Sequence, residues 1–514
     1  MVKKVLIVGG GTAGWLTAAR LAKQFIDSGS DIEVSIVESA NIPTIGVGEG
    51  TWPTIRDTLK TLDICETEFL NTCDATFKQG AKFVNWKKVA DENEDIYYRH
   101  LFTSLYDPWE FNLAPFWSSG IAGEVPYSEA VSMQGDVCEQ GKAPKNITTP
   151  QYEGLQGYAY HLDAAKFANL LKDKAVNKMK VRHIIADIGH VSVQSDGSIE
   201  YVETVTGEKL HADLFIDCTG FKCLLLGDAM KVPFVDLSHT LFVNRAVALQ
   251  VPYENPNSPI ACETISTAQP EGWIWDIGLQ SRRGIGFVYS DKYISKDCAE
   301  QRIREYAGIN TDDISAKHLE FQVGYREKFW HKNCVAIGLS AAFVEPLEAS
   351  AIFLVEAAVN MLCDKFPHSQ HEFEFIEKQF NQSFLFRWNK TIEFIKMHYV
   401  LSQRTDGQFW LDNKNINSIP DELRSKLAHW QNNPLSKYDF ASAFEPFVMD
   451  SYQYVLYGMG FKTEVDSSRL SAEKTKKARA MFAEVNKYRT LVQEKLPNHR
   501  ELIEKLKEYK FPKV

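Results

Sequence analysis

The sequence has few of the features that mark a membrane protein, a metalloprotein or a nucleic-acid-binding protein. Its apolar runs are of strand length, which is too short to cross a bilayer. The formal net charge is -10 at pH 7 and no sustained basic face is present, which argues against a nucleic-acid partner. The nine cysteines are scattered and never spaced C-x-x-C, which indicates reduced thiols without a zinc site. Together with an N-terminus that lacks a cleavable leader pattern, these absences predict a cytoplasmic protein with neither a metal nor a membrane partner.

Internal repeats and low-complexity linkers are also absent, so only shifts in residue pattern divide the 514 residues. The first part, 1–365, alternates predicted strands and helices, and an irregular stretch rich in aromatic residues, proline and glycine interrupts it at about 87–156. The second part, 366–514, has apolar residues at helical spacing and ends in an amphipathic pair of helices, broken at Pro497, that we expect to be solvated. These patterns predict an α/β module with inserted elements, followed by a mostly helical C-terminal region.

The first forty residues carry the most informative pattern. An apolar strand at 5–8 leads into Gly9-x-Gly11-x-x-Gly14 and a predicted helix. In this arrangement the glycines allow a tight turn and bring the backbone close to a pyrophosphate at the helix N-terminus. A second apolar strand at 32–37 ends in Glu38, where a carboxylate can accept hydrogen bonds from a ribose. The order of strand, glycine turn, helix, strand and acid predicts a Rossmann-like dinucleotide-binding module.

Several stretches resemble the flavin-dependent halogenases of the tryptophan-halogenase type, over most of the chain up to about residue 400. They are the glycine turn at 9–15, the stretch 42–51, Phe77-Lys78 with 83–86, the stretch 273–277 and the stretch 343–348. Gly278 stands where the family has a proline, which loosens the backbone there. We expect Trp273 and Trp275 to face opposite sides of their strand. The resemblance implies an FAD-binding module of the glutathione-reductase or hydroxylase type with inserted substrate-binding elements.

The resemblance also implies a reaction. Such an enzyme binds FADH2 from a separate flavin reductase and uses oxygen and a halide, bromide or chloride, to form hypohalous acid. The acid then halogenates an indole or another electron-rich arene with the help of a lysine and a glutamate, which by motif are Lys78 and Glu348. Apolar surroundings would favour the neutral amine that a nucleophilic lysine needs. The simpler alternatives are an ordinary solvated lysine, for which Lys82 is the competitor, and a carboxylate that opens an apolar helix and is stabilised by the helix dipole.

Contacts to the cofactor and to the halide follow from the same resemblance. The expected FAD contacts are Gly9, Gly11, Thr12, Ala13, Gly14, Glu38, Gly48 and Gly338. The expected halide contacts are Ser350 and Ala351, within Ala349-Ser350-Ala351, which replaces the family's Ser-Thr-Gly. Because the glycine is missing and chloride is the smaller and more strongly hydrated ion, we predict that bromide is preferred.

The expected substrate contacts are His100, Phe102, Phe447 and Val448, which match the aromatic box of tryptophan-specific members. Val448 replaces the tryptophan of that box. Tyr438 and Glu445 are only the nearest matches to the residues that grip the charged groups of tryptophan. Losing the indole opens the pocket, and losing the polar clamp removes the reason to select free tryptophan. The sequence therefore predicts an indole or another activated arene as the substrate.

Two alternatives to a halogenase stay open from the sequence. A flavin-dependent aromatic monooxygenase would use the same nucleotide fold without needing Lys78 or Glu348, and a non-catalytic homologue would bind flavin alone. No second dinucleotide fingerprint for NAD(P)H is present, which favours dependence on a separate reductase over a self-sufficient hydroxylase. The sequence also leaves a homodimer open.

Overall fold

The computed structural model describes residues 1–42, 48–90, 96–308, 311, 313–440, 442–466, 468 and 470–513. The part of the second family stretch at 43–47 therefore lies outside the described residues. The chain forms two compact units, each assembled from three segments. The first unit contains Met1–Ala75, Leu162–Leu237 and Phe321–Trp388, and the second unit contains Thr76–His161, Ser238–Glu320 and Asn389–Val514. The division at 365 and the insertion at 87–156 were drawn from residue pattern and stay a prediction.

A mostly parallel sheet is the centre of the first unit. Its strands, in order across the sheet, are β20 (Trp330–His331), β21 (Cys334–Ala336), β12 (Leu214–Asp217), β1 (Lys4–Val8), β2 (Glu33–Glu38) and β8 (Arg182–Ile185). Neighbouring strands are parallel except the edge pair β20 and β21. Every residue of 5–8 is buried, as expected for an inner strand of a parallel sheet. This sheet confirms the predicted α/β class.

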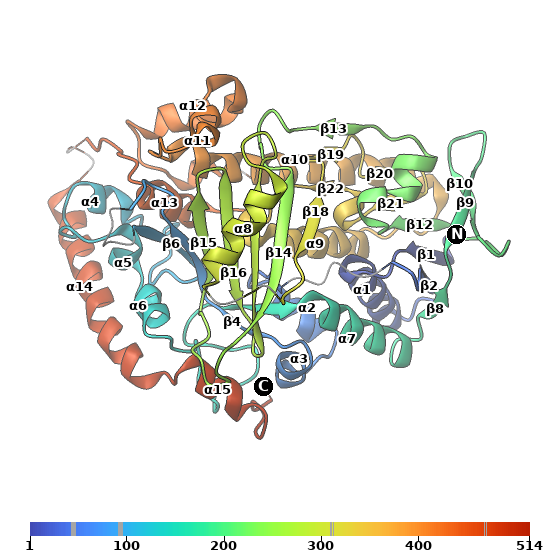
Figure 1. The fold of residues 1–514 in the computed structure, drawn as a ribbon, viewed down its shortest axis with the longest axis horizontal. Coiled ribbons are helices and arrows are strands. Elements are labelled where there is room, and N and C mark those ends of the chain that lie inside the picture. The colour runs from blue at the N-terminus through green and yellow to red at the C-terminus, as the bar shows by residue number, and fades with distance from the viewer. Residues whose placement is uncertain are drawn as a thin grey trace. The chain divides into compact units, whose positions relative to one another are not determined.

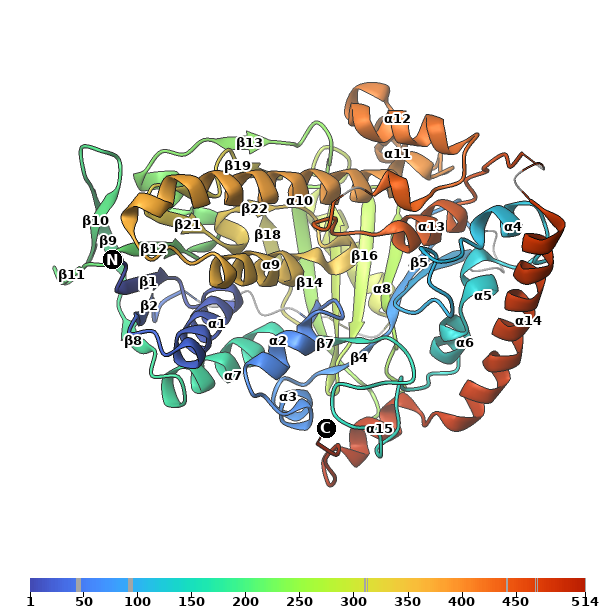
Figure 2. The ribbon, with the colours of Figure 1, turned by 180° about the vertical axis from the view of Figure 1, so that it is seen from behind.

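Helix α1 (Thr12–Ser28) packs against β2 and against two other helices of the first unit, α7 (Ala164–Asn177) and α9 (Ser350–Asp364) (Figures 1 and 2). The start of α7 was predicted from Asp163, whose carboxylate accepts hydrogen bonds from the backbone N–H groups of Ala165 and Lys166. The other elements of this unit are α2 (Ile55–Thr61), α3 (Glu66–Thr72), β3 (Gly48–Gly50), β9 (Ile188–Val193), β10 (Ile199–Thr204), β11 (Lys209–Leu210), β13 (Phe234–Asp236), β19 (Gly324–Arg326) and β22 (Ala342–Phe343). Along the chain, β7 (Ala159–Asp163) and α10 (Phe373–Leu401) each run from one unit into the other.

A mostly antiparallel sheet is the centre of the second unit. Its strands, in order, are β18 (Lys317–Glu320), β14 (Arg245–Pro252), β17 (Arg282–Tyr289), β16 (Gly272–Gly278), β15 (Thr264–Gln269), β5 (Gly80–Val84) and β6 (Tyr97–Leu101). Only β15 and β5 are paired in parallel. Helix α8 (Lys296–Ala307) packs on β14 and β17 (Figure 1), where its buried Ile303 joins an apolar cluster that includes Val247 and Phe287. A short strand, β4 (Thr76–Lys78), pairs with β7.

The expectation that Trp273 and Trp275 face opposite sides of their strand is wrong. Both lie in β16, and their ring centroids are 6.4 Å apart. Side chains on a strand alternate with a period of two, so residues two apart point to the same face. The Trp86 ring lies 6.1 Å from the Trp273 ring, and a Cβ on Gly286 would lie 1.9 Å from the Trp275 ring. The two indoles therefore belong to one packed face of the sheet.

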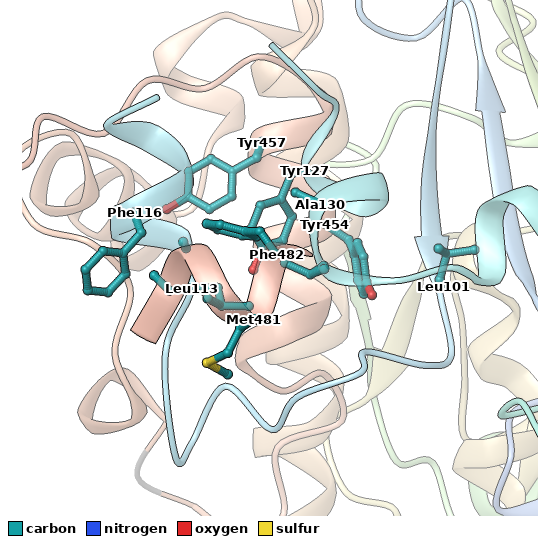
Figure 3. Close-up of a cluster of buried hydrophobic side chains, with 12 residues drawn as sticks. Leu101, Leu113, Phe116, Tyr127, Ala130, Tyr454, Tyr457, Met481 and Phe482 are labelled. Carbon is teal, nitrogen blue, oxygen red and sulfur yellow. The ribbon is translucent and has the colours of Figure 1, made fainter. Parts of the chain in front are cut away.

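The C-terminal half of the second unit is helical, as predicted. Its helices are α11 (Gln408–Asn413), α12 (Asp421–Trp430), α13 (Met449–Gly458), α14 (Ala472–Lys495) and α15 (His499–Lys505). Three further helices of this unit follow β6 along the chain: α4 (Ala114–Ser118), α5 (Tyr127–Val131) and α6 (Gln134–Glu139). The tail is the predicted pair of helices, but it is not simply solvated. Met481 and Phe482 of α14 are buried beside Tyr127 and Tyr454 in a cluster that also draws on β6 and α4 (Figure 3). No helix among the described residues is long and apolar enough to cross a membrane.

Candidate active site

The turn between β1 and α1 requires glycine for steric reasons. Gly9 has a φ of +113°, and a Cβ there would lie 2.2 Å from the carbonyl oxygen of Cys218. A Cβ on Gly14 would lie 1.9 Å from the carbonyl oxygen of Gly9. Gly11 is the N-cap of α1, and nothing lies within 4 Å of the position of its missing Cβ. The outer glycines thus let the backbone close, while Gly11 leaves room beside the helix N-terminus.

The N-terminus of α1 suits an anion. No side chain caps it, and its first turn, which includes Thr12 and Ala13, contains no acidic residue. The free backbone N–H groups and the helix dipole there favour a phosphate. Gly338 lies beside this turn, because a Cβ on it would come 2.8 Å from the Cβ of Ala13. These residues fit the pyrophosphate of FAD, whereas Gly48 lies farther along the chain, buried at the start of β3.

Glu38 ends β2 as predicted, and its side chain is anchored beside the glycine turn. Its Oε1 lies 2.8 Å from Nε2 of His183 and 3.5 Å from Nζ of Lys172, while its Oε2 accepts from the Trp15 indole at 3.4 Å. A Cβ on Gly10 would lie 1.7 Å from Oε2. Gly10 was not among the predicted contacts, because the fingerprint treats its position as variable. Here it must be glycine so that the Glu38 carboxylate can reach the turn.

Glu348 lies in a strained turn just before α9 and not inside the helix. The turn is Leu347–Ala349, and Glu348 and Ala349 have φ values of +68° and +53°, in the left-handed region that non-glycine residues avoid. The Glu348 side chain is buried, and α9 begins at Ser350. The Ala349 N–H donates to the Pro346 carbonyl oxygen at 3.0 Å, so an anion here would meet the backbone N–H groups at the N-terminus of α9. Of the two expected halide contacts, Ser350 is buried and Ala351 is exposed.

Lys78 is enclosed in the second unit. It ends β4 opposite Ala159 of β7, its side chain is 2% exposed, and Nζ lies 5.4 Å from the centroid of the Phe102 ring. Lys82 has different surroundings: it is partly exposed and forms an ion pair with Glu139 at 3.3 Å. Lys82 also has an aromatic neighbour, because its Nζ lies 4.1 Å from the centroid of the Tyr97 ring, so burial is what distinguishes Lys78 from Lys82.

Two buried histidines surround the Lys78 strand. His499 Nε2 accepts a hydrogen bond from the backbone N–H of Phe77 at 3.0 Å, and burial lowers the pKa of His499 to about 4. His161 Nε2 lies 2.8 Å from the hydroxyl of Thr264, and burial, helped by the charge of Lys78, lowers the pKa of His161 well below its usual value. Both imidazoles are therefore neutral at pH 7. Sequence reasoning missed them, because one lies in a strand and the other in a tail predicted to be solvated.

Two of the four predicted substrate residues, His100 and Phe447, lie around Phe394 of α10. The Phe447 ring stacks on the Phe394 ring at 3.8 Å and 13°, and the His100 ring lies 6.0 Å from Phe394 and 5.9 Å from Tyr454. Val448 is 40% exposed. Phe394 was missed because helical spacing marks it only as a core residue. The structure thus brings His100 and Phe447 together in one aromatic group and leaves Val448 at the surface.

The nearest matches to the amino-acid clamp do not form an enclosed polar pair. Tyr438 is 83% exposed. Glu445 is half-buried, and this burial raises the pKa of its carboxyl group. A tyrosine that is almost wholly in water offers little discrimination between substrates, because buried polar groups supply most of it.

The fold and these contacts define a dinucleotide-binding α/β protein with a buried lysine beside an aromatic group. Among the described residues, no cluster of three or more His, Cys, Asp or Glu is arranged to hold a metal ion. The sequence model of the tryptophan halogenase family matches residues 4–475.

Known proteins agree with this match. A crystal structure of tryptophan halogenase from Shewanella frigidimarina NCIMB 400 is 40% identical with a TM-score of 0.96, covering 100% of this chain and 99% of that one. The 7-chloro-L-tryptophan 6-halogenase KtzR of Kutzneria sp. (strain 744) is 33% identical over 98% of this chain and 99% of its own. The tryptophan 7-halogenase RebH of Lentzea aerocolonigenes is 31% identical over 98% of each chain. The chain belongs to the tryptophan halogenases, a family of flavin-dependent oxidoreductases, which confirms the family and the class of enzyme predicted from its motifs.

The neutral state of His499 predicts how stability depends on pH. With a pKa of about 4 in the folded protein and about 6.5 in the unfolded chain, the unfolded chain binds this proton first as the pH falls. The contribution of His499 is constant above pH 6.5, and the free energy of unfolding should fall by about 2 kcal/mol between pH 7 and pH 5 on its account. Urea unfolding of the parent and of His499→Gln at both pH values measures this. Equal pH dependence in the two proteins would contradict the prediction.

Proposed function

We propose that this protein uses FADH2, oxygen and a halide to form hypohalous acid, and that it halogenates the indole ring of a small substrate. The observation that carries the proposal is the enclosure of Lys78, which is 2% exposed with its amino group 5.4 Å from the Phe102 ring. Burial next to an aromatic side chain protects a reactive oxidant from water, which an exposed lysine could not do. Membership of the tryptophan halogenases supports the same reaction.

Each residue of the proposed site has a separate part in the reaction. Reduced FAD, when bound at the glycine turn, supplies the two electrons with which oxygen and a halide ion give hypohalous acid. Lys78 either holds this acid through a hydrogen bond from its amino group or takes up the halogen as a haloamine with release of water. Glu348 accepts the proton that leaves the arene carbon when the halogen is added. The backbone N–H groups of Ser350 and Ala351, at the start of α9, hold the halide.

The substrate is proposed from two observations. The relatives named above are tryptophan halogenases, which supports an indole ring as the acceptor. Val448 at 40% exposure and Tyr438 at 83% exposure leave the side that would grip an amino acid open. We therefore propose an indole that need not carry the charged groups of free tryptophan.

The source of the reduced flavin is proposed from the sequence. No second dinucleotide fingerprint accompanies the one at the glycine turn. A protein without a site for NAD(P)H needs FADH2 made elsewhere, so we propose a separate flavin reductase as its partner. A cytoplasmic location, where NADH and a reductase are at hand, fits this dependence.

Replacing Lys78 with alanine should reduce halogenated product to background while FAD binding and flavin reoxidation stay close to those of the parent, because Lys78 acts after the oxidant is made. The assay combines the protein with FAD, a flavin reductase, NADH, oxygen and bromide, and mass spectrometry detects the bromine isotope pair on indole. The matched control is Lys82→Ala, which removes a lysine four residues away and should keep its activity. Bromination by Lys78→Ala at the parent's rate would refute the role of Lys78, and an oxygenated product would identify a monooxygenase.

Replacing Glu348 with glutamine keeps the shape of the side chain and removes its charge. If the carboxylate accepts the arene proton, kcat should fall by about two orders of magnitude, as is usual for a positioned acid–base group. Glu345→Gln, a change at the other buried glutamate of the motif, is the control and tests the register of the assignment. Preserved turnover in Glu348→Gln, with only thermal stability altered, would show that the carboxylate merely stabilises the helix terminus.

Bromide should outcompete chloride, and indole should be a better substrate than free tryptophan. The halide part follows from Ala349-Ser350-Ala351 and from the easier oxidation of bromide, and the substrate part follows from the open surroundings of Val448 and Tyr438. Competition assays with equimolar halides, run in parallel on indole and tryptophan, test both parts. Chlorotryptophan as the main product would overturn this description of the substrate pocket while leaving the halogenase proposal intact.

A further inference from the structure

Trp52 connects the turn that carries Glu348 to the helix that follows it. Its indole Nε1–H donates a hydrogen bond to the backbone carbonyl oxygen of Glu348 at 2.7 Å. The same ring stacks on Phe353 of α9, with centroids 4.2 Å apart and planes 20° from parallel. One side chain from the segment between β3 and α2 therefore contacts both the Glu348 turn and the first turns of α9, all within the first unit.

The Glu348 turn needs such support. Glu348 and Ala349 both have left-handed backbone conformations, with φ values of +68° and +53°. Each is disfavoured for a residue with a Cβ, and such conformations persist only when the surrounding structure holds them. Relaxation of either residue would turn the Glu348 carbonyl away from its present direction and would redirect the carboxylate attached to the same residue.

Trp52 is itself held in place. Thr54, two residues on, donates from Oγ1 to the Glu356 carboxylate of α9 at 3.1 Å, and Thr58 of α2 donates to the other oxygen of the same carboxylate. Glu356 is 3% exposed, and burial raises the pKa of its carboxyl group to about 7. The segment 52–58 is thus attached at three points, to the Glu348 carbonyl ahead of α9 and to Phe353 and Glu356 within α9, which ties the indole to both the turn and the helix.

We propose that Trp52 is a positioning residue for Glu348. Its N–H holds the Glu348 carbonyl in the left-handed turn, and its stack on Phe353 fixes the indole, so that the carboxylate leaves the turn in one direction. The inference deepens the proposed function, because it rests on Glu348 as the proton acceptor. It also gives the strained backbone a purpose: the turn aims a carboxylate that a regular helical start would direct elsewhere.

The test compares three variants by kinetics. Trp52→Phe keeps a ring on Phe353 and removes the N–H, and it should lower kcat for halogenation by roughly tenfold to a hundredfold with KM for the arene unchanged, as expected when a reacting group is displaced. Trp52→His restores a flat ring with an N–H of similar reach and should recover most of the loss. The matched control is Trp330→Phe, which removes another indole N–H···O=C bond of the first unit, from Trp330 to Lys332 at 2.8 Å, and should leave kcat unchanged.

A stability cycle tests the same inference without cofactor or activity. Glycine adopts a positive φ freely, so Ala349→Gly removes part of the strain that Trp52 opposes. Trp52→Phe should therefore lower the melting temperature less in the Ala349→Gly background than in the parent, which is a measurable coupling between the two sites. Additive changes in the four proteins would overturn the inference.

The outcomes separate this inference from the proposed function. If Glu348→Gln keeps its turnover, the proposed role of Glu348 is wrong, and the positioning of a catalytic carboxylate fails with it. If Glu348→Gln is inactive but Trp52→Phe matches Trp330→Phe in kcat, the halogenase proposal stands and the positioning role of Trp52 is refuted. Loss of kcat in Trp52→Phe, recovery in Trp52→His and a coupled cycle together support it.

Discussion

The close approach of backbone to backbone at the glycine turn is the constraint on which the first unit depends. A Cβ on Gly9 would overlap the carbonyl of Cys218, and a Cβ on Gly14 would overlap the carbonyl of Gly9. Cys218 follows β12, so this contact holds the ends of two neighbouring parallel strands together. Gly10 allows Glu38, at the end of β2, to reach the same turn. The ends of three strands and the start of α1 therefore meet at this turn, with the Glu38 carboxylate against Gly10, and the uncapped helix N-terminus is available for a phosphate.

Burial determines the charge state of the two histidines around Lys78. His161 and His499 are both kept neutral by desolvation, so neither adds a positive charge near Lys78 at pH 7. The two neutral imidazoles still form hydrogen bonds. His499 accepts one from the backbone N–H of Phe77, and His161 forms one with the Thr264 hydroxyl. The two histidines therefore surround Lys78 with hydrogen-bonded but uncharged side chains.

In the first unit, the comparable feature is the backbone strain at Glu348 and Ala349. Two consecutive left-handed residues at Glu348 and Ala349 interrupt what would otherwise be the start of an apolar helix. The simpler alternative from the sequence is a carboxylate that opens the helix and is stabilised by its dipole, whereas the backbone places Glu348 ahead of the N-cap of α9. A stabilising interaction alone would not require this geometry. Contacts from a distant segment, through Trp52, Thr54 and Thr58, surround the turn and the helix that follows it.

The sequence by itself determined those features whose geometry depends only on residues close together along the chain. The glycine turn, the strands around it, the Asp163 cap and the family motifs with Lys78 and Glu348 could all be found in this way, because glycine spacing, apolar periodicity and capping act over a few residues. The error at Trp273 and Trp275 was one of strand geometry, which the alternation of side chains corrects.

Tertiary structure alone decided which distant residues meet. Three pairs of residues in contact are separated by dozens to hundreds of positions along the chain, and no local pattern marks them. They are Phe394 with Phe447, His499 with Phe77, and Trp52 with Glu348. The burial of Lys78 and the exposure of Val448 and Tyr438 have the same origin. Burial and long-range contact are properties of the packed chain, so the residue types of the motifs were in the sequence, whereas the environment around them exists only in the fold.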